Sequence, residues 1–248
     1  RRTFTLPAHW EGDGEVLLRF DGVMSAFYVW INGEKVGYSQ GSMEASEFNV
    51  TRYLQKGQNQ IALEVYRYSD GSYLEDQDFW RFGGIHRDIT LIHTHKVAFR
   101  DYTVRTLPAK PGCYDDFILQ VDPAFVVRQG ELGVGYRAKA ELEMTDLEGR
   151  QVSGLEVDVP EVLDLEHKAS RMNLWYPQRG PRRMGRMQAI VKSPHRWTAE
   201  TPNLYKLHLT LMNEKGEVVQ QIEQRVGFRI VEIKNGQMLV NGAPIRFR

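Results

Sequence analysis

Cysteine is almost absent from this sequence of 248 residues, since Cys113 is the only one. A single thiol excludes an intramolecular disulfide and a metal site built from several cysteines. Cys113 lies in a stretch rich in proline and glycine, with no histidine or asparagine in a suggestive position nearby, so we do not expect a nucleophile there. The number of cysteines does not decide whether the protein is located in the cytoplasm or in the periplasm.

The sequence also lacks net charge and long hydrophobic runs. Its 32 Lys and Arg residues balance 32 Asp and Glu residues, which gives no electrostatic reason to expect nucleic acid or an anionic membrane as a partner. The longest apolar run, at 26–31, is far shorter than the roughly 20 residues of a transmembrane helix. We therefore expect no nucleic acid partner and no membrane span.

Helical periodicity is hard to find, and apolar residues instead recur at every second position. Between 134 and 144 they alternate with charged residues, which predicts a half-buried strand with one solvated face. Leucines alternate in the same way between 205 and 211. The pattern predicts an all-β protein.

Turn signals separate these expected strands. Asn32 and Gly33 follow an apolar run and predict a hairpin with a type I′ turn, because both residues tolerate positive φ. A second hairpin turn is expected at 213–216, and two Asn-Gly pairs flank a short expected strand at 237–240. Many short strands between turns indicate β-sandwiches, and the pattern breaks near 93–100.

A cluster of carboxylates, aromatic rings and glycines at 69–88 does not alternate like a strand. Carboxylates accept hydrogen bonds from sugar hydroxyls and aromatic faces cover apolar sugar faces, so the cluster suits a polyol. A solvated loop with one buried aspartate capping backbone amides explains the composition equally well. A retaining glycosidase uses two carboxylates about 5 to 5.5 Å apart, commonly on different elements, so the spacing of Glu75, Asp76 and Asp78 assigns no catalytic pair.

Two other clusters have plainer explanations. His93 and His95 share one strand face, which suits a metal site only if a third ligand comes from elsewhere, and we expect a solvent-facing pair at a strand end. The stretch 167–187 is basic, with aromatic residues inside it, a pattern that also binds single-stranded nucleic acid. Its prolines and glycines and the neutral overall charge favour a long irregular loop that packs on a neighbouring domain or subunit.

Several motifs together resemble glycoside hydrolase family 2. The stretch 20–48 is similar to its N-terminal sugar-binding domain, and SDGSYLEDQD at 69–78 looks most like its β-galactosidase branch. The stretches 197–205 and 226–229 are similar to the family's immunoglobulin-like domain, and 235–242 is similar to the entry into its catalytic barrel.

The resemblance implies a fold and a domain order. We expect a jelly-roll (galactose-binding-like) sandwich at 1–95, truncated at its N-terminus, and an immunoglobulin-like β-sandwich at 96–230. Residues 231–248 would be the first strands leading into a missing (β/α)₈ barrel. The sequence begins at Arg1 without methionine and stops at Arg248 inside an expected strand, so we expect a piece of a longer protein.

The resemblance also implies an activity for that longer protein. It would be a retaining β-galactosidase that hydrolyses terminal non-reducing β-D-galactose residues. Two barrel glutamates, with a magnesium ion beside them, would perform the chemistry. No catalytic residue is expected in this chain, which should be inactive alone and should bind no cofactor tightly.

Site residues are implied at a few positions. By resemblance, Asp78 binds the galactosyl end of the substrate, partly through a sodium ion. Trp80 and Arg81 either line the pocket or, as we favour, pack this loop against the barrel. Gln40 and Asp70 match positions that help to hold a structural divalent ion, whose remaining ligands would lie upstream.

Two alternatives remain open. In the first, the parent enzyme is a β-glucuronidase or a β-mannosidase. In the second, the chain is a non-catalytic carbohydrate-binding module, and this alternative predicts saturable sugar binding by the chain alone. The expected partners are a β-galactoside and the missing barrel. We also expect a homo-oligomer, formed through open sheet edges or through the basic stretch at 167–187.

Overall fold

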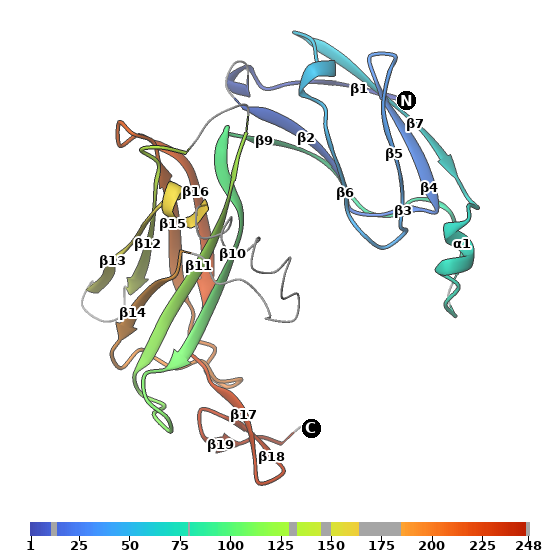
Figure 1. Cartoon of the computed structure of the whole chain (residues 1–248). Helices are drawn as coiled ribbons and strands as arrows, with labels where there is room; N and C mark the ends of the chain where they lie inside the picture. The colour runs from blue at the N-terminus through green and yellow to red at the C-terminus, as the bar shows by residue number, and fades with distance from the viewer. Residues whose placement is uncertain (11–13, 79, 129–132, 145–149, 164–184, 247–248) are drawn as a thin grey trace, which may run out of the picture. The chain divides into compact units, whose positions relative to one another are not determined.

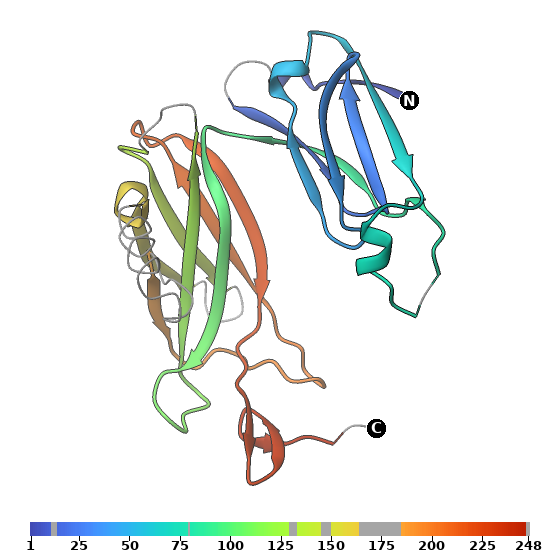
Figure 2. The same cartoon turned by 45° about the vertical axis from the view of Figure 1, so that its right-hand side comes forward.

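The chain folds into two compact units, at 1–96 and 97–248 (Figures 1 and 2). This computed structural model describes residues 1–10, 14–78, 80–128, 133–144, 150–163 and 185–246. Most of the basic stretch 167–187, expected to pack on a neighbour or to mediate oligomerisation, lies outside them, at 167–184. Strands dominate both units, which confirms the all-β prediction. Within the described part, no helix has the length and apolar character needed to cross a membrane.

Unit 1 is the jelly-roll sandwich, with two main antiparallel sheets and a short strand pair. The first sheet has the order β1 (Arg2–Thr5), β7 (Gln58–Tyr66), β4 (Ala26–Ile31) and β5 (Glu34–Gln40). The second has the order β6 (Ser46–Asn49), β2 (Glu15–Phe20) and β9 (Ile89–Thr94). The short pair is β3 (Val23–Met24) with β8 (Gly84–Ile85), and the helical elements are η1 (Ala8–Trp10), η2 (Thr51–Tyr53) and α1 (Gly71–Leu74).

The predicted Asn-Gly hairpin joins β4 to β5. Asn32 has φ +52° and Gly33 has φ +87°, as a type I′ turn requires at both central residues. The turn sets a register in which Ile31 faces Glu34. Every second residue of β4 therefore points into the core, where Val29 and Ile31 are fully buried.

The core of unit 1 fills the space between its two sheets. Phe20 on β2 and Phe27 on β4 pack with tilted rings whose centroids are 4.7 Å apart, and Phe48 packs edge-on against both rings. Fully burying a side chain of this size contributes about 1.5–3 kcal/mol. The sandwich gives the loops at its ends a rigid support.

Unit 2 is the immunoglobulin-like sandwich. One sheet has the order β10 (Val97–Pro108), β11 (Phe117–Val127) and β14 (Met187–Val191). The other has the order β13 (Arg150–Asp158), β12 (Arg137–Met144), β15 (Tyr205–Met212) and β16 (Val218–Val226). The predicted alternation on β15 is confirmed, since Leu207, Leu209 and Leu211 are fully buried.

A small meander ends unit 2. It consists of β17 (Val231–Lys234), β18 (Gln237–Val240) and β19 (Ala243–Pro244). Asn235 and Gly236 make the first turn, and Asn241 and Gly242 make the second, all with positive φ. Both Asn-Gly turns predicted in this stretch are thus confirmed.

One predicted strand begins later than expected. Val134 lies in a turn between Gly133 and Gly135, both at positive φ, and its side chain is 67% exposed. Extended strands require negative φ, so the two glycines end the alternation. The strand β12 starts only at Arg137, and the prediction was wrong for 134–136.

The histidine pair also differs from expectation. His93 lies within β9 and stacks on Trp10 of η1, with ring centroids 5.4 Å apart. Both His93 and His95 are half-buried rather than solvent-facing. The described residues contain no group of three or more histidine, cysteine or acidic side chains placed to hold a metal ion.

Candidate functional site

The segment after β7 carries most of the predicted site residues and begins with a single helical turn. Asp70 caps α1, and its Oδ1 accepts a hydrogen bond of 3.0 Å from the Gly71 amide. Ser72 Oγ accepts another of 3.0 Å from the Ser69 amide. The helix ends at Glu75, whose amide donates to the Gly71 carbonyl at 2.9 Å. Asp70 thus caps a backbone amide as expected of one aspartate in this cluster, but the expectation that this aspartate is buried was wrong, since Asp70 is exposed.

Serine hydroxyls fasten the start of this helix to the sandwich. Ser25 Oγ and Ser69 Oγ lie 2.6 Å apart, and Ser72 Oγ donates to Ser25 Oγ at 3.3 Å. Ser25 is buried, and its amide donates to the Tyr66 carbonyl at 2.9 Å. The cluster thus connects α1 to the beginning of β4.

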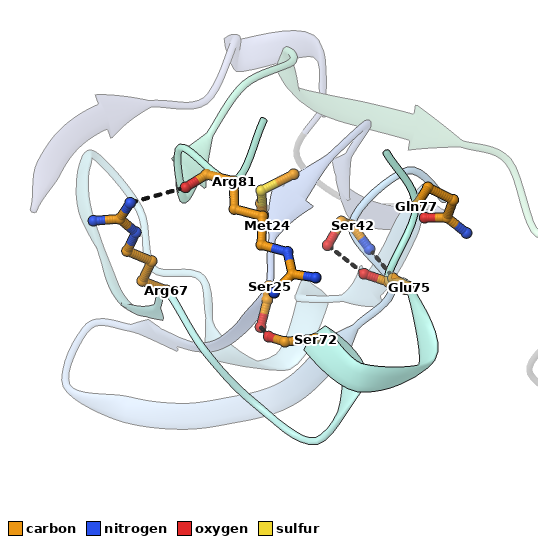
Figure 3. A pocket seen from close by; sticks show the side chains of 8 residues that line it. All are labelled: Met24, Ser25, Ser42, Arg67, Ser72, Glu75, Gln77 and Arg81. Carbon is orange, nitrogen blue, oxygen red and sulfur yellow. Dashed lines mark hydrogen bonds between the residues drawn. The ribbon is translucent and has the colours of Figure 1, made fainter. Parts of the chain in front are cut away.

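The end of the helix is held by a carboxylate. Glu75 Oε1 accepts from the Ser42 amide at 2.9 Å, and Glu75 Oε2 accepts from the Ser42 hydroxyl at 2.5 Å (Figure 3). Ser42 is only 3% exposed and follows β5. Hydrogen bonds to an ionised acceptor are about twice as strong as neutral ones, so this is a firm connection.

The later part of the segment, around Arg81 and Gly83 (the returning limb), is attached to the sandwich through arginines. Arg67 Nη2 donates to the Arg81 carbonyl at 3.0 Å (Figure 3). The Arg81 guanidinium forms an ion pair with Asp76. Gly83 has φ +73°, and a Cβ there would lie 2.9 Å from Arg67 Cγ, so both the conformation and the close approach require glycine.

A small cavity lies between these attachments (Figure 3). Its volume is about 20 Å³, enough for one water molecule. Ligand pockets commonly measure about 300–1,000 Å³, so the cavity cannot enclose a sugar ring. It is lined by Met24, Ser25, Ser42, Arg67, Ser72, Glu75, Gln77 and Arg81.

Asp78 lies three residues beyond the Glu75 attachment and is exposed. Within the described part of the chain, its side chain has no hydrogen-bond or ion-pair partner. Nearby, Trp80 and Phe82 stack with centroids 6.0 Å apart, and each is 78% exposed. An available carboxylate therefore lies close in sequence to two exposed aromatic faces.

Trp80 and Arg81 thus differ in their surroundings. Arg81 lines the small cavity and pairs with Asp76, whereas the described residues leave Trp80 largely uncovered.

Gln40 and Asp70 lie near each other around Tyr38. The Tyr38 hydroxyl donates to Gln40 Oε1 at 2.6 Å, and a Cβ on Gly71 would lie 4.0 Å from Gln40 Cδ. The pKa of Tyr38 is raised above 10, first by burial and then by the negative charges of Asp70 and Tyr28.

The donor set for a metal ion is incomplete here. Gln40 and Asp70 provide an amide oxygen and a carboxylate, while Mg²⁺ and Ca²⁺ take about six to eight oxygen ligands. Asp78 is a single exposed carboxylate. The described residues therefore do not form a complete magnesium or sodium site by themselves.

Sequence reasoning missed the residues that hold the segment in place. Ser42 and Glu75 are 33 positions apart, and Ser25 and Ser69 are 44 apart. Neither periodicity nor spacing connects residues so distant. The sequence treats Glu75 as one carboxylate of a polyol-binding or catalytic cluster, and its bonds to Ser42 appear only in the folded chain.

Comparison with known proteins identifies both units. Residues 1–95 match the profile of the sugar-binding domain of glycosyl hydrolases family 2, and residues 132–229 match a second profile of that family.

Curated relatives match along the whole chain. It is 42% identical over 247 residues to a β-galactosidase from Priestia megaterium and 38% identical over 249 residues to one from Aeromonas hydrophila. All of this chain is covered in both comparisons, but it spans only 22% of the length of either relative.

Solved structures share the fold at lower identity. A calcium-binding mutant of Bacteroides uniformis β-glucuronidase 2 superposes with a TM-score of 0.70 at 22% identity, over all of this chain and 28% of that chain. A β-glycosidase from Bacteroides vulgatus gives 0.68 at 20% identity, over 98% of this chain and 27% of that chain. These likenesses show the fold alone.

Proposed function

The chain belongs to glycosyl hydrolase family 2, and on that premise we propose that it forms the sugar-binding and immunoglobulin-like domains of a retaining β-galactosidase. The observation that carries the proposal is the 42% identity to a β-galactosidase over the whole chain. The β-glucuronidase structures are at most 22% identical, so they support the fold and not the sugar.

In this proposal the chain binds and does not catalyse. Asp78 accepts hydrogen bonds from hydroxyls of the galactosyl unit, because its carboxylate is exposed and free of partners within the described part. Trp80, two positions further along the chain, has an exposed ring, which lines the pocket or, as we favour, packs this segment against the barrel. The two catalytic glutamates belong to a barrel outside this chain, and we assign no step to magnesium or sodium.

The test is a hydrolysis panel on the complete protein that contains this chain, with aryl β-galactoside, β-glucuronide and β-mannoside as substrates. We expect preferential galactoside cleavage, and no turnover above a blank for the chain alone. Asp78→Ala should lower kcat/KM for the galactoside by roughly 10- to 100-fold, the equivalent of one or two lost charged hydrogen bonds.

The matched control is Glu34→Ala, which removes an exposed carboxylate of the same unit outside the cluster at 69–88 and should keep full activity. Preference for another glycoside would show that the galactoside assignment is wrong. If nothing is cleaved and the chain alone binds sugar saturably, it is a non-catalytic carbohydrate-binding module.

A further inference from the structure

Resting on the proposed function, we propose that Glu75 is a positioning residue, whose attachment to Ser42 holds Asp78 where the substrate binds. Asp78 contributes the carboxylate, and Glu75 determines where that carboxylate is.

Both oxygens of the Glu75 carboxylate are used in this attachment. They accept from the amide and the hydroxyl of one buried residue, Ser42, at 2.9 and 2.5 Å. Figure 3 shows the Glu75 side chain directed at Ser42. A carboxylate held in this way has little capacity left for acid–base chemistry on a substrate, so its role is to connect the segment to the end of β5.

Glu75 is close enough in the chain to govern Asp78. Asp78 is three positions after Glu75, and an extended chain covers at most about 10–11 Å over that interval. Since Asp78 has no side-chain partner within the described part, its position depends on how the chain around it is held.

The other nearby attachment is weaker. The side chains of Asp76 and Arg81 are 65% and 41% exposed, and exposed ion pairs contribute little because water screens them. The Arg67 bond to the Arg81 carbonyl holds the returning limb and not the helix end. Glu75 therefore provides the strongest attachment on the side of Asp78 that leads from α1.

The geometry predicts how two substitutions should differ. Glutamine keeps an oxygen to accept from the Ser42 amide, and its NH₂ can donate to the Ser42 hydroxyl, which also accepts. Alanine removes both bonds. A catalytic carboxylate would lose its function in either variant, whereas a positioning residue should be rescued by glutamine.

The experiment measures kcat and KM for an aryl β-galactoside with the complete enzyme. We expect Glu75→Ala to lower kcat/KM about tenfold or more, and Glu75→Gln to stay within about threefold of the unmodified enzyme. In an Asp78→Ala background, Glu75→Ala should cause no further loss, because the residue it positions is gone. Glu64→Ala, which removes an exposed glutamate bonded to the Tyr66 hydroxyl on β7, should leave activity unchanged.

A second readout examines the loop itself. Hydrogen exchange at the amides of 71–78 should be faster in Glu75→Ala and unchanged in Glu64→Ala. If Glu75→Ala does not fold, Ser42→Ala replaces it, since this variant removes only the hydroxyl bond and should give smaller effects in the same direction.

Several results would overturn the proposal. The first is full activity of Glu75→Ala when Asp78→Ala is impaired. The second is a loss of kcat/KM in the double variant that equals the sum of the two single losses in free energy. The third is a Glu75→Gln variant that is as inactive as Glu75→Ala. If Asp78→Ala is fully active, the role of Asp78 in the proposed function fails. Faster exchange in Glu75→Ala would then still support the attachment, and unchanged exchange would refute it.

Discussion

At the scale of single residues, a buried asparagine illustrates how unit 1 satisfies its polar groups. Asn59 is 1% exposed. Its Nδ2 donates to the carbonyls of Gln55 and Gly57, and its Oδ1 accepts from the Gln55 amide and from Asn32 Nδ2. Asn32 also donates to the Tyr53 carbonyl and accepts from the Gln60 amide. The two asparagines thus join the β4–β5 turn to the start of β7.

We expect Asn59→Ala to destabilise unit 1 by about 1–3 kcal/mol, because it removes four hydrogen bonds made by a side chain that is 1% exposed. Urea unfolding of the chain measures the change. The control is Asn49→Ala, which removes an exposed side chain that accepts from Thr51 and should cost less, since water replaces its bonds. Equal losses in the two variants would contradict the argument from burial.

At the scale of elements, the meander β17–β19 is attached by a few specific contacts. The Tyr114 hydroxyl donates to Glu232, which raises the pKa of Tyr114 above 10. Asn241 accepts from the Ile230 amide at 2.9 Å and donates to the Trp197 carbonyl at 3.0 Å. The ring of Tyr114 also lies against Gly242.

The two Asn-Gly turns of this meander provide a matched comparison. Gly236 has φ +73° with open space around its Cβ position, whereas at Gly242, φ +78°, a Cβ would lie 2.6 Å from Tyr114 Cε2. Alanine at either site adopts an unfavourable left-handed conformation, at about 1–3 kcal/mol.

We expect Gly242→Ala to be clearly more destabilising than Gly236→Ala, because only the former also displaces Tyr114. Hydrogen exchange at residues 231–244 measures the difference. In a Tyr114→Ala background the two variants should become alike. A persistent difference there would mean that something other than the ring distinguishes the turns.

At the scale of the whole molecule, the chain has two separate hydrophobic cores. One contains Phe20, Phe27 and their neighbours within unit 1. The other contains Leu209, Phe117 and their neighbours within unit 2, and the two share no residue. Each unit therefore has its own source of stability.

We expect core substitutions to act within one unit. Phe20→Ala should destabilise unit 1 by about 3–5 kcal/mol, and Leu209→Ala should destabilise unit 2 by about 2–5 kcal/mol. Hydrogen exchange along the chain should show lost protection at 1–96 in the first variant and at 97–248 in the second. Equal loss across both units in either variant would show that they unfold as one.

The sequence alone determined most of the local structure. Alternation placed the leucines of β15 in the core, and Asn-Gly pairs marked the hairpin at 32–33 and both turns of the meander. Both features are local: the strand period decides which face a side chain takes, and the residue type decides whether positive φ is tolerated. The same local logic failed at Val134, where two glycines outweighed the alternation.

Only the tertiary structure decided which distant residues meet. The Ser42–Glu75 attachment joins positions 33 apart, and the Tyr114–Glu232 bond joins positions 118 apart. No spacing rule connects such pairs, because the sheet order brings them together. Thus the motif at 69–78 predicts that this segment contacts a sugar, whereas only the folded chain shows that Glu75 attaches the segment to Ser42.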